Sequence, residues 1–166
     1  MQPTIHLSIV LPIMLQILQA LVLLLLAITI LRKRKLIVEP IGAMDYSTVI
    51  FCSSILFGVL LISAGDSVYF LRAYKSVVAT DNVWGNTFSA FSRYFLTTIC
   101  ATALFVGLTF IAAELFSRGK SREEFAGGNI PLGIFCSGIA LGLAFVMNSI
   151  ATPVYEWLTP VYLNFR

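Results

Sequence analysis

The chain has 166 residues, of which 58% are hydrophobic and only 11% are charged, and its mean hydropathy is +0.92. Soluble domains are nearer half apolar and about a quarter charged, so this composition excludes both a disordered chain and a water-soluble fold. The net charge of +3 is spread over several loops. Nucleic-acid surfaces need clustered basic side chains, so no nucleic-acid partner is expected.

Four apolar stretches follow one another along the chain, and each reaches about the twenty residues that a helix needs to cross a bilayer core. In lipid only helices satisfy their own backbone hydrogen bonds, and these stretches are too long for barrel strands. The sequence therefore predicts an all-α membrane protein, a single membrane domain over 1–166 with four transmembrane helices. The predicted spans are 7–31, 46–71, 93–116 and 129–151.

The first span is expected to stay in the mature protein. Residues 1–8 carry no Lys or Arg, and no small-residue cleavage site follows the apolar run. That run is also too long for the hydrophobic region of a signal peptide.

The basic residues next to the spans predict the orientation. Loops 32–45 and 117–128 together hold seven Lys or Arg residues, whereas the opposite side of the membrane holds four. The positive-inside rule places these two loops in the cytoplasm and both termini outside. Trp84 and Trp157 fall on the outer side, as interfacial aromatic residues do. The segment 153–166 is expected to lie along that outer surface.

The chain repeats part of itself after 84 residues: the tetrapeptide IFCS at 50–53 recurs at 134–137. Small residues follow at matching positions in both copies. We therefore expect a parallel tandem repeat of a two-helix unit, with the first helix pair over 7–72 and the second over 93–152. Because each unit crosses the membrane twice, both copies start on the same side.

The small residues of the repeat form a stripe on the second helix of each pair. Lipid supplies no hydrophobic drive for helix association, so residues that permit close backbone approach supply much of it. The pattern predicts that span two packs on span four along these stripes. The alternative is that small residues are simply common in membrane helices. The residues of the two stripes are Ser54, Gly58, Gly65, Gly138, Gly142 and Ser149.

The segment GNIPLGIFCSGIALG at 128–142 resembles the segment that opens the second helix of each repeat in the bacterial domain-of-unknown-function family 350. The resemblance covers about residues 10–150. It implies a short inner-membrane protein built from two tandem helix pairs, and it implies no particular activity. Asn129 matches the family pattern, whereas in the first copy Asp45 stands where the Asn is expected.

Asp66 is the main candidate functional residue, because a charged side chain within a membrane is costly and by default suggests a function. Asn148 of the last span falls at nearly the same depth, and Arg93 begins the third span. A hydrogen bond to Asn148 or an ion pair with Arg93 is expected to offset the cost of burial. Two interpretations stay open: Asp66 binds a proton or cation, or it joins helices as a polar clamp.

The other polar residues have simpler explanations. Glu114 precedes Arg118 by one helical turn, which favours an ion pair at the interface. The run Arg32-Lys33-Arg34-Lys35 is expected to set the topology, to bind anionic lipid headgroups, or both. His6 is the only histidine, and no cluster has metal-ligand spacing. We therefore expect no catalytic residue, metal or cofactor.

These features predict a non-enzymatic protein that self-associates or serves as a structural or accessory subunit of a membrane complex. Short loops leave helix faces as the main surfaces for specific contacts. The expected partners are therefore the lipid bilayer and a second copy or other membrane subunits. The alternative is a small oligomeric pore or transporter with Asp66 near the permeation path. The predicted location is the bacterial cytoplasmic (inner) membrane.

Overall fold

The computed structural model describes residues 4–37, 44–77 and 83–158, and within these ranges every regular element is a helix. Four helices are long and apolar enough to cross a membrane, which confirms the all-α architecture that the composition predicts. A short additional helix joins the last two of them. The helices are α1 (Thr4–Lys33), α2 (Tyr46–Val77), α3 (Val83–Phe116), α4 (Ser121–Ala126) and α5 (Ile130–Leu158).

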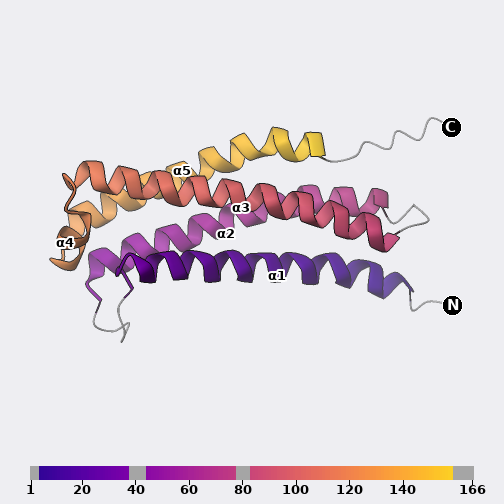
Figure 1. Ribbon diagram of the computed structural model, residues 1–166, viewed down its shortest axis with the longest axis horizontal. Coiled ribbons are helices and arrows are strands. Elements are labelled where there is room, and N and C mark those ends of the chain that lie inside the picture. Colours follow the sequence, from indigo (N-terminus) through magenta and orange to yellow (C-terminus); the bar gives the residue numbers. More distant parts are fainter. Residues whose placement is uncertain (1–3, 38–43, 78–82, 159–166) are drawn as a thin grey trace.

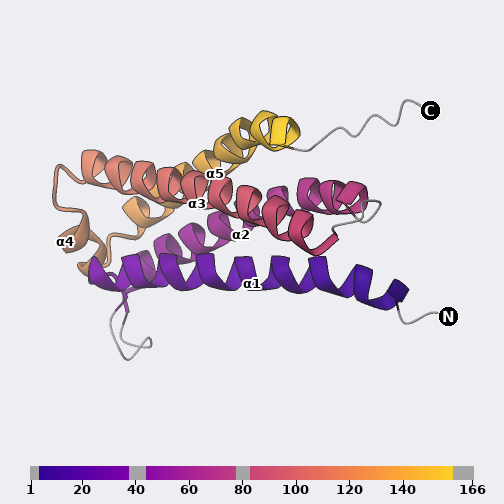
Figure 2. The ribbon, with the colours of Figure 1, turned by 45° about the vertical axis from the view of Figure 1, so that its right-hand side comes forward.

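The four long helices run along a common direction, with α4 at one end of the bundle (Figure 1). That end, which we call the loop end, holds the described parts of 34–45 and 117–129; α1 begins and α5 ends at the other end. α2 is the central helix, because it packs on α1, α3 and α5, and most extensively on α5. Within the described residues the backbones of α1 and α5 do not approach each other closely, and the two helices lie on opposite sides of the bundle (Figure 2).

Three helices extend well beyond their predicted spans, and α2 continues past the predicted end at Leu71 to Val77. α3 begins at Val83, before the predicted start near Arg93. The hydropathy pattern missed these first turns because they mix polar and aromatic residues.

α5 continues through Pro153 to Leu158, beyond the predicted end of the fourth span, so the first residues of the predicted surface segment are helical. Proline is tolerated within membrane helices, and Pro153 leaves the carbonyl of Ser149 without its usual helical N–H donor. The rest of the predicted segment, 159–166, lies outside the described residues.

Glycines of α2 and α5 lie where the two helices approach most closely. A Cβ added at Gly133 would lie 2.9 Å from both Cα and the carbonyl oxygen of Ser47. Added at Gly58 it would meet Phe105 Cζ at 2.4 Å and Ala144 Cβ at 3.1 Å. No side chain could be accommodated at these points without displacing a neighbour. The absence of a Cβ therefore permits the close approach of the helices.

The predicted stripe on α5 does not face α2, and that part of the prediction is wrong. Gly138, Gly142 and Ser149 are exposed, and a Cβ at either glycine would meet nothing within 4 Å. The α5 residues that are buried instead follow the spacing of one helix face, at intervals of three, four or seven apart from one adjacent pair: Gly133, Cys136, Ser137, Ala140, Ala144, Ala151 and Tyr155. The sequence repeat failed here because α2 has neighbours on three sides, so its stripe is covered, whereas α5 is peripheral.

Candidate functional site

A carboxylate lies at the point where all four long helices meet. Asp66 of α2 is fully buried. The side chains of Gln19 of α1 and Thr98 of α3 lie beside it, and Tyr155 of α5 lies next to Thr98. Each of these three residues is at most 1% exposed. The central position of α2 explains the arrangement, because α2 packs extensively on each of the other three long helices and can present one side chain to all of them.

Hydrogen bonds link these residues into a network. Gln19 Nε2 donates to Asp66 Oδ2 at 2.5 Å. The Thr98 side chain faces the same carboxylate, and its hydroxyl is 3.1 Å from the Tyr155 hydroxyl. The Tyr94 hydroxyl donates to the Tyr155 carbonyl at 3.4 Å. One turn from Gln19, Gln16 Oε1 accepts from Ser67 Oγ at 2.7 Å, so two amides fasten α1 to α2.

Several buried polar atoms of the network have no hydrogen-bond partner within the described part of the chain. They are Asp66 Oδ1, Gln19 Oε1, Gln16 Nε2 and Thr102 Oγ1. An ionised carboxylate with so few donors is costly away from water. The arrangement is therefore suited to a proton on the carboxyl group, or to a small cation held by the spare acceptors of Asp66 and Gln19.

The partners predicted for Asp66 are wrong. Arg93 is exposed and Asn148 only half-buried, and neither bonds to Asp66. Asn148 packs on Gly65 instead, where an added Cβ would lie 1.8 Å from its Oδ1. Successive residues of a helix point about 100° apart. Gly65 faces Asn148 of α5, so the next residue, Asp66, points in a different direction and bonds to Gln19 of α1.

Gln19 is the hydrogen-bond partner of Asp66 that the sequence interpretation missed. The signal was available, since Gln16 and Gln19 are polar residues one turn apart in an otherwise apolar stretch. Gln19 and Thr98 lie near the middles of α1 and α3. The carboxylate is therefore deeper in the bundle than its predicted place near the outer end of span two.

At the loop end the predicted pair of Glu114 and Arg118 does not form. α3 ends at Phe116 and Arg118 has a φ of 54°, so the two residues no longer share a helix face. Glu114 Oε1 accepts a hydrogen bond from Ser121 Oγ at 2.7 Å instead. The basic run Arg32-Lys33-Arg34-Lys35 is exposed at this end, as binding to headgroups requires. The side chain of His6 lies outside those that the structure describes.

Comparison of the chain with family models, curated proteins and solved structures finds no match. The resemblance to family 350 therefore stays a prediction, and so does the tandem repeat. Inferences about function rest on the geometry of the chain itself.

Proposed function

We propose that this chain is a non-enzymatic membrane protein that self-associates through the outer face of α5 and acts as a structural or accessory subunit. In this proposal it resides in a bacterial inner membrane with both termini outside the cytoplasm. The observation that carries the proposal is the exposed pair Gly138 and Gly142, one turn apart. Small residues at this spacing are typical of helix dimer interfaces in membranes.

The surroundings of Gly138 and Gly142 support their role in an interface with another helix. A Cβ at either glycine would meet nothing within 4 Å, so the chain itself makes no use of their small size. Phe135 and Phe145 project beside them and are 51% and 59% exposed. Small residues beside large exposed side chains can receive the same face of a second helix, which permits backbone approach and dispersion contact.

Symmetry restricts the form of the assembly. Two copies inserted in the same orientation present their α5 helices parallel to each other. An interface that uses one face of both copies is then a twofold dimer, with its axis along the membrane normal. Such a dimer leaves the Asp66 network of each copy unchanged, because that network lies on the inner side of α5.

The double variant Gly138→Leu/Gly142→Leu is expected to convert the assembly to monomers without lowering thermal stability. The leucines fill the interface, and their Cβ atoms meet nothing of their own chain within 4 Å. Native mass spectrometry in mild detergent measures the assembly, and thermal unfolding measures the fold. Ala64→Leu on α2 is the control, since that position is also exposed but lies on another helix.

The proposal fails if the wild type is monomeric and alone, or if the double variant keeps the wild-type mass. A companion protein that dissociates from the double variant but not from the control would identify the accessory form of the proposal.

The second candidate is an oligomeric pore or transporter in which Asp66 binds a proton or cation. The supporting observation is the fully buried Asp66 carboxylate, one oxygen of which has no hydrogen-bond partner among the described residues, as is also true of Gln19 Oε1. Such intramembrane groups mark ion and proton pathways in other proteins. A single chain offers few polar side chains along its length, so this candidate requires several copies.

For this candidate Asp66→Asn is expected to abolish pH-driven proton flux into liposomes, because an amide cannot exchange a proton at this site. Flux is measured with an internal pH-sensitive dye under an imposed pH gradient. Asp45→Asn is the control, since it removes an exposed carboxylate at the loop end. Equal flux in the wild type, in Asp66→Asn and in empty liposomes would eliminate a proton pathway.

A further inference from the structure

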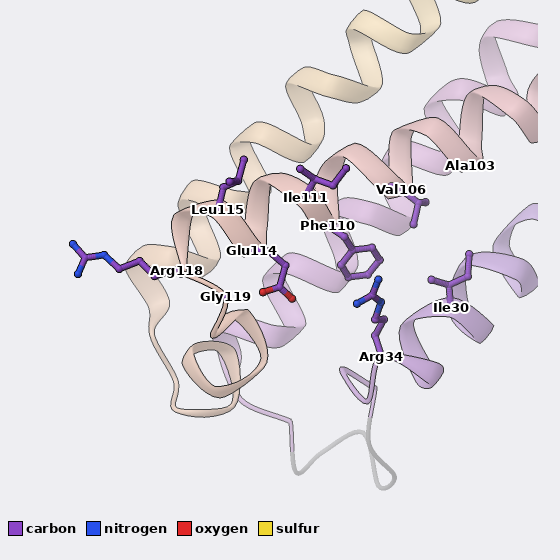
Figure 3. A pocket seen from close by; sticks show the side chains of 11 residues that line it. Ile30, Arg34, Ala103, Val106, Phe110, Ile111, Glu114, Leu115, Arg118 and Gly119 are labelled. Carbon is purple, nitrogen blue, oxygen red and sulfur yellow. The ribbon is translucent and has the colours of Figure 1, made fainter.

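A groove of about 780 Å³ runs between α1 and α3 at the loop end of the bundle. It exists because α1 packs mainly on α2 and approaches α3 at only a few positions. Figure 3 shows its walls: Ile30 and Arg34 on the α1 side, and side chains from Ala103 to Leu115 along α3. The groove opens to the outside of the bundle, where the bilayer lies.

The floor of the groove on α3 is shaped for an apolar chain. Ala103 and Gly107 lie one turn apart, and a Cβ at Gly107 would meet nothing within 4 Å. Val106 and Ile111 form apolar walls beside them. Space of this kind between membrane helices is filled by acyl chains, because unfilled volume forfeits dispersion contacts.

The loop end of the same groove carries two opposite charges. Arg34 lies over the Phe110 ring at 5.2 Å from guanidinium carbon to ring centroid. Glu114, one turn beyond Phe110, is oriented by its hydrogen bond from Ser121. In Figure 3 the guanidinium and the carboxylate face the same space beside the ring, whereas Arg118 points away. The two charges form no ion pair with each other in the described structure.

We propose that this groove binds one phospholipid whose headgroup carries a primary ammonium, such as phosphatidylethanolamine. Its phosphate is received by Arg34, its ammonium by Glu114, and one acyl chain follows Ala103 and Gly107. The headgroup is chosen because its negative phosphate and positive ammonium complement the positive Arg34 and the negative Glu114. A primary ammonium donates hydrogen bonds to a carboxylate, a quaternary choline has no N–H to donate, and a glycerol headgroup has no cation.

Lipid retention in native mass spectrometry tests the proposal. The protein is reconstituted in nanodiscs with equal parts of dioleoyl phosphatidylethanolamine, phosphatidylcholine and phosphatidylglycerol. We expect one ethanolamine lipid per chain, preferred over the choline lipid about tenfold, the factor that corresponds to about 1.4 kcal/mol. Glu114→Gln keeps an acceptor for Ser121 and is expected to remove the preference. Arg34→Gln is expected to lower the retention of all three lipids.

Gly107→Leu fills the floor of the groove and is expected to abolish retention of any lipid. Ala64→Leu, at an exposed position of α2 outside the groove, is the control that leaves retention unchanged. The proposal is overturned if phosphatidylglycerol is preferred, which would assign recognition to the exposed basic run alone. It is also overturned if Glu114→Gln keeps the preference, or if Gly107→Leu disrupts an oligomer that retains no lipid, since a second copy would then occupy the groove.

Discussion

Gly133→Ala is expected to lower the free energy of unfolding by about 1–3 kcal/mol, the range for overpacking a tight contact. The added methyl group would lie 2.9 Å from the backbone of Ser47. A backbone atom cannot move aside as the end of a side chain can, so α5 must shift along its whole contact with α2. The free energy of unfolding is measured by denaturation with SDS in mixed micelles.

Gly138→Ala provides the comparison on the same helix. A Cβ at Gly138 meets nothing within 4 Å, and alanine is the better helix former by up to about 1 kcal/mol. This variant is therefore expected to unfold at the same SDS fraction as the wild type or at a higher one. Equal destabilisation by both variants would contradict the packing of α5 on α2 described above.

The second large effect is expected for Gln19→Leu, which removes the one side-chain N–H that donates to Asp66. The carboxylate is then left buried with fewer partners, a change that costs about 1–3 kcal/mol. The double variant Gln19→Leu/Asp66→Leu is expected to recover most of this loss, because replacing both partners of a buried polar pair leaves neither unpaired.

A double-mutant cycle measures the coupling between the two residues. The four proteins are the wild type, Gln19→Leu, Asp66→Leu and the double variant, each unfolded in the same mixed micelles. If the effects of the single variants simply add, the hydrogen bond does not hold α1 to α2. If the double variant recovers stability but has lost proton flux, the carboxylate has a function beyond joining helices.

The sequence was sufficient for the architecture because a membrane restricts a chain strongly. Backbone groups in lipid must bond within their own helix. Four long apolar stretches therefore form four membrane-spanning helices, and the composition is enough to predict them. The ends of α3 and α5 could not be predicted in the same way. Their first or last turns carry aromatic and polar residues, and tertiary packing, as for the buried Tyr155, keeps such residues helical.

The candidate site could be predicted by residue type but not by partner. Asp66 stands out in an apolar stretch, yet the rotation of α2 decides which neighbour it meets. That rotation follows from the contact of Gly65 with Asn148, which spacing alone does not reveal. The two glycine stripes illustrate the same limit. The stripe residues are buried or half-buried in α2 and exposed in α5, because α2 is the central helix and α5 is peripheral.

The bond between Gln19 and Asp66 also has a consequence for how the chain enters the membrane. α1 is synthesised first, and its amide group is in place before the carboxylate of α2 arrives. The first helical hairpin thus contains both members of the pair, while Thr98 and Tyr155 come later in the chain. The hydrogen bond from Gln19 therefore lowers the free-energy cost of transferring Asp66 into lipid as soon as the first hairpin inserts. The α1–α2 hairpin can then remain in the bilayer until α3 and α5 insert.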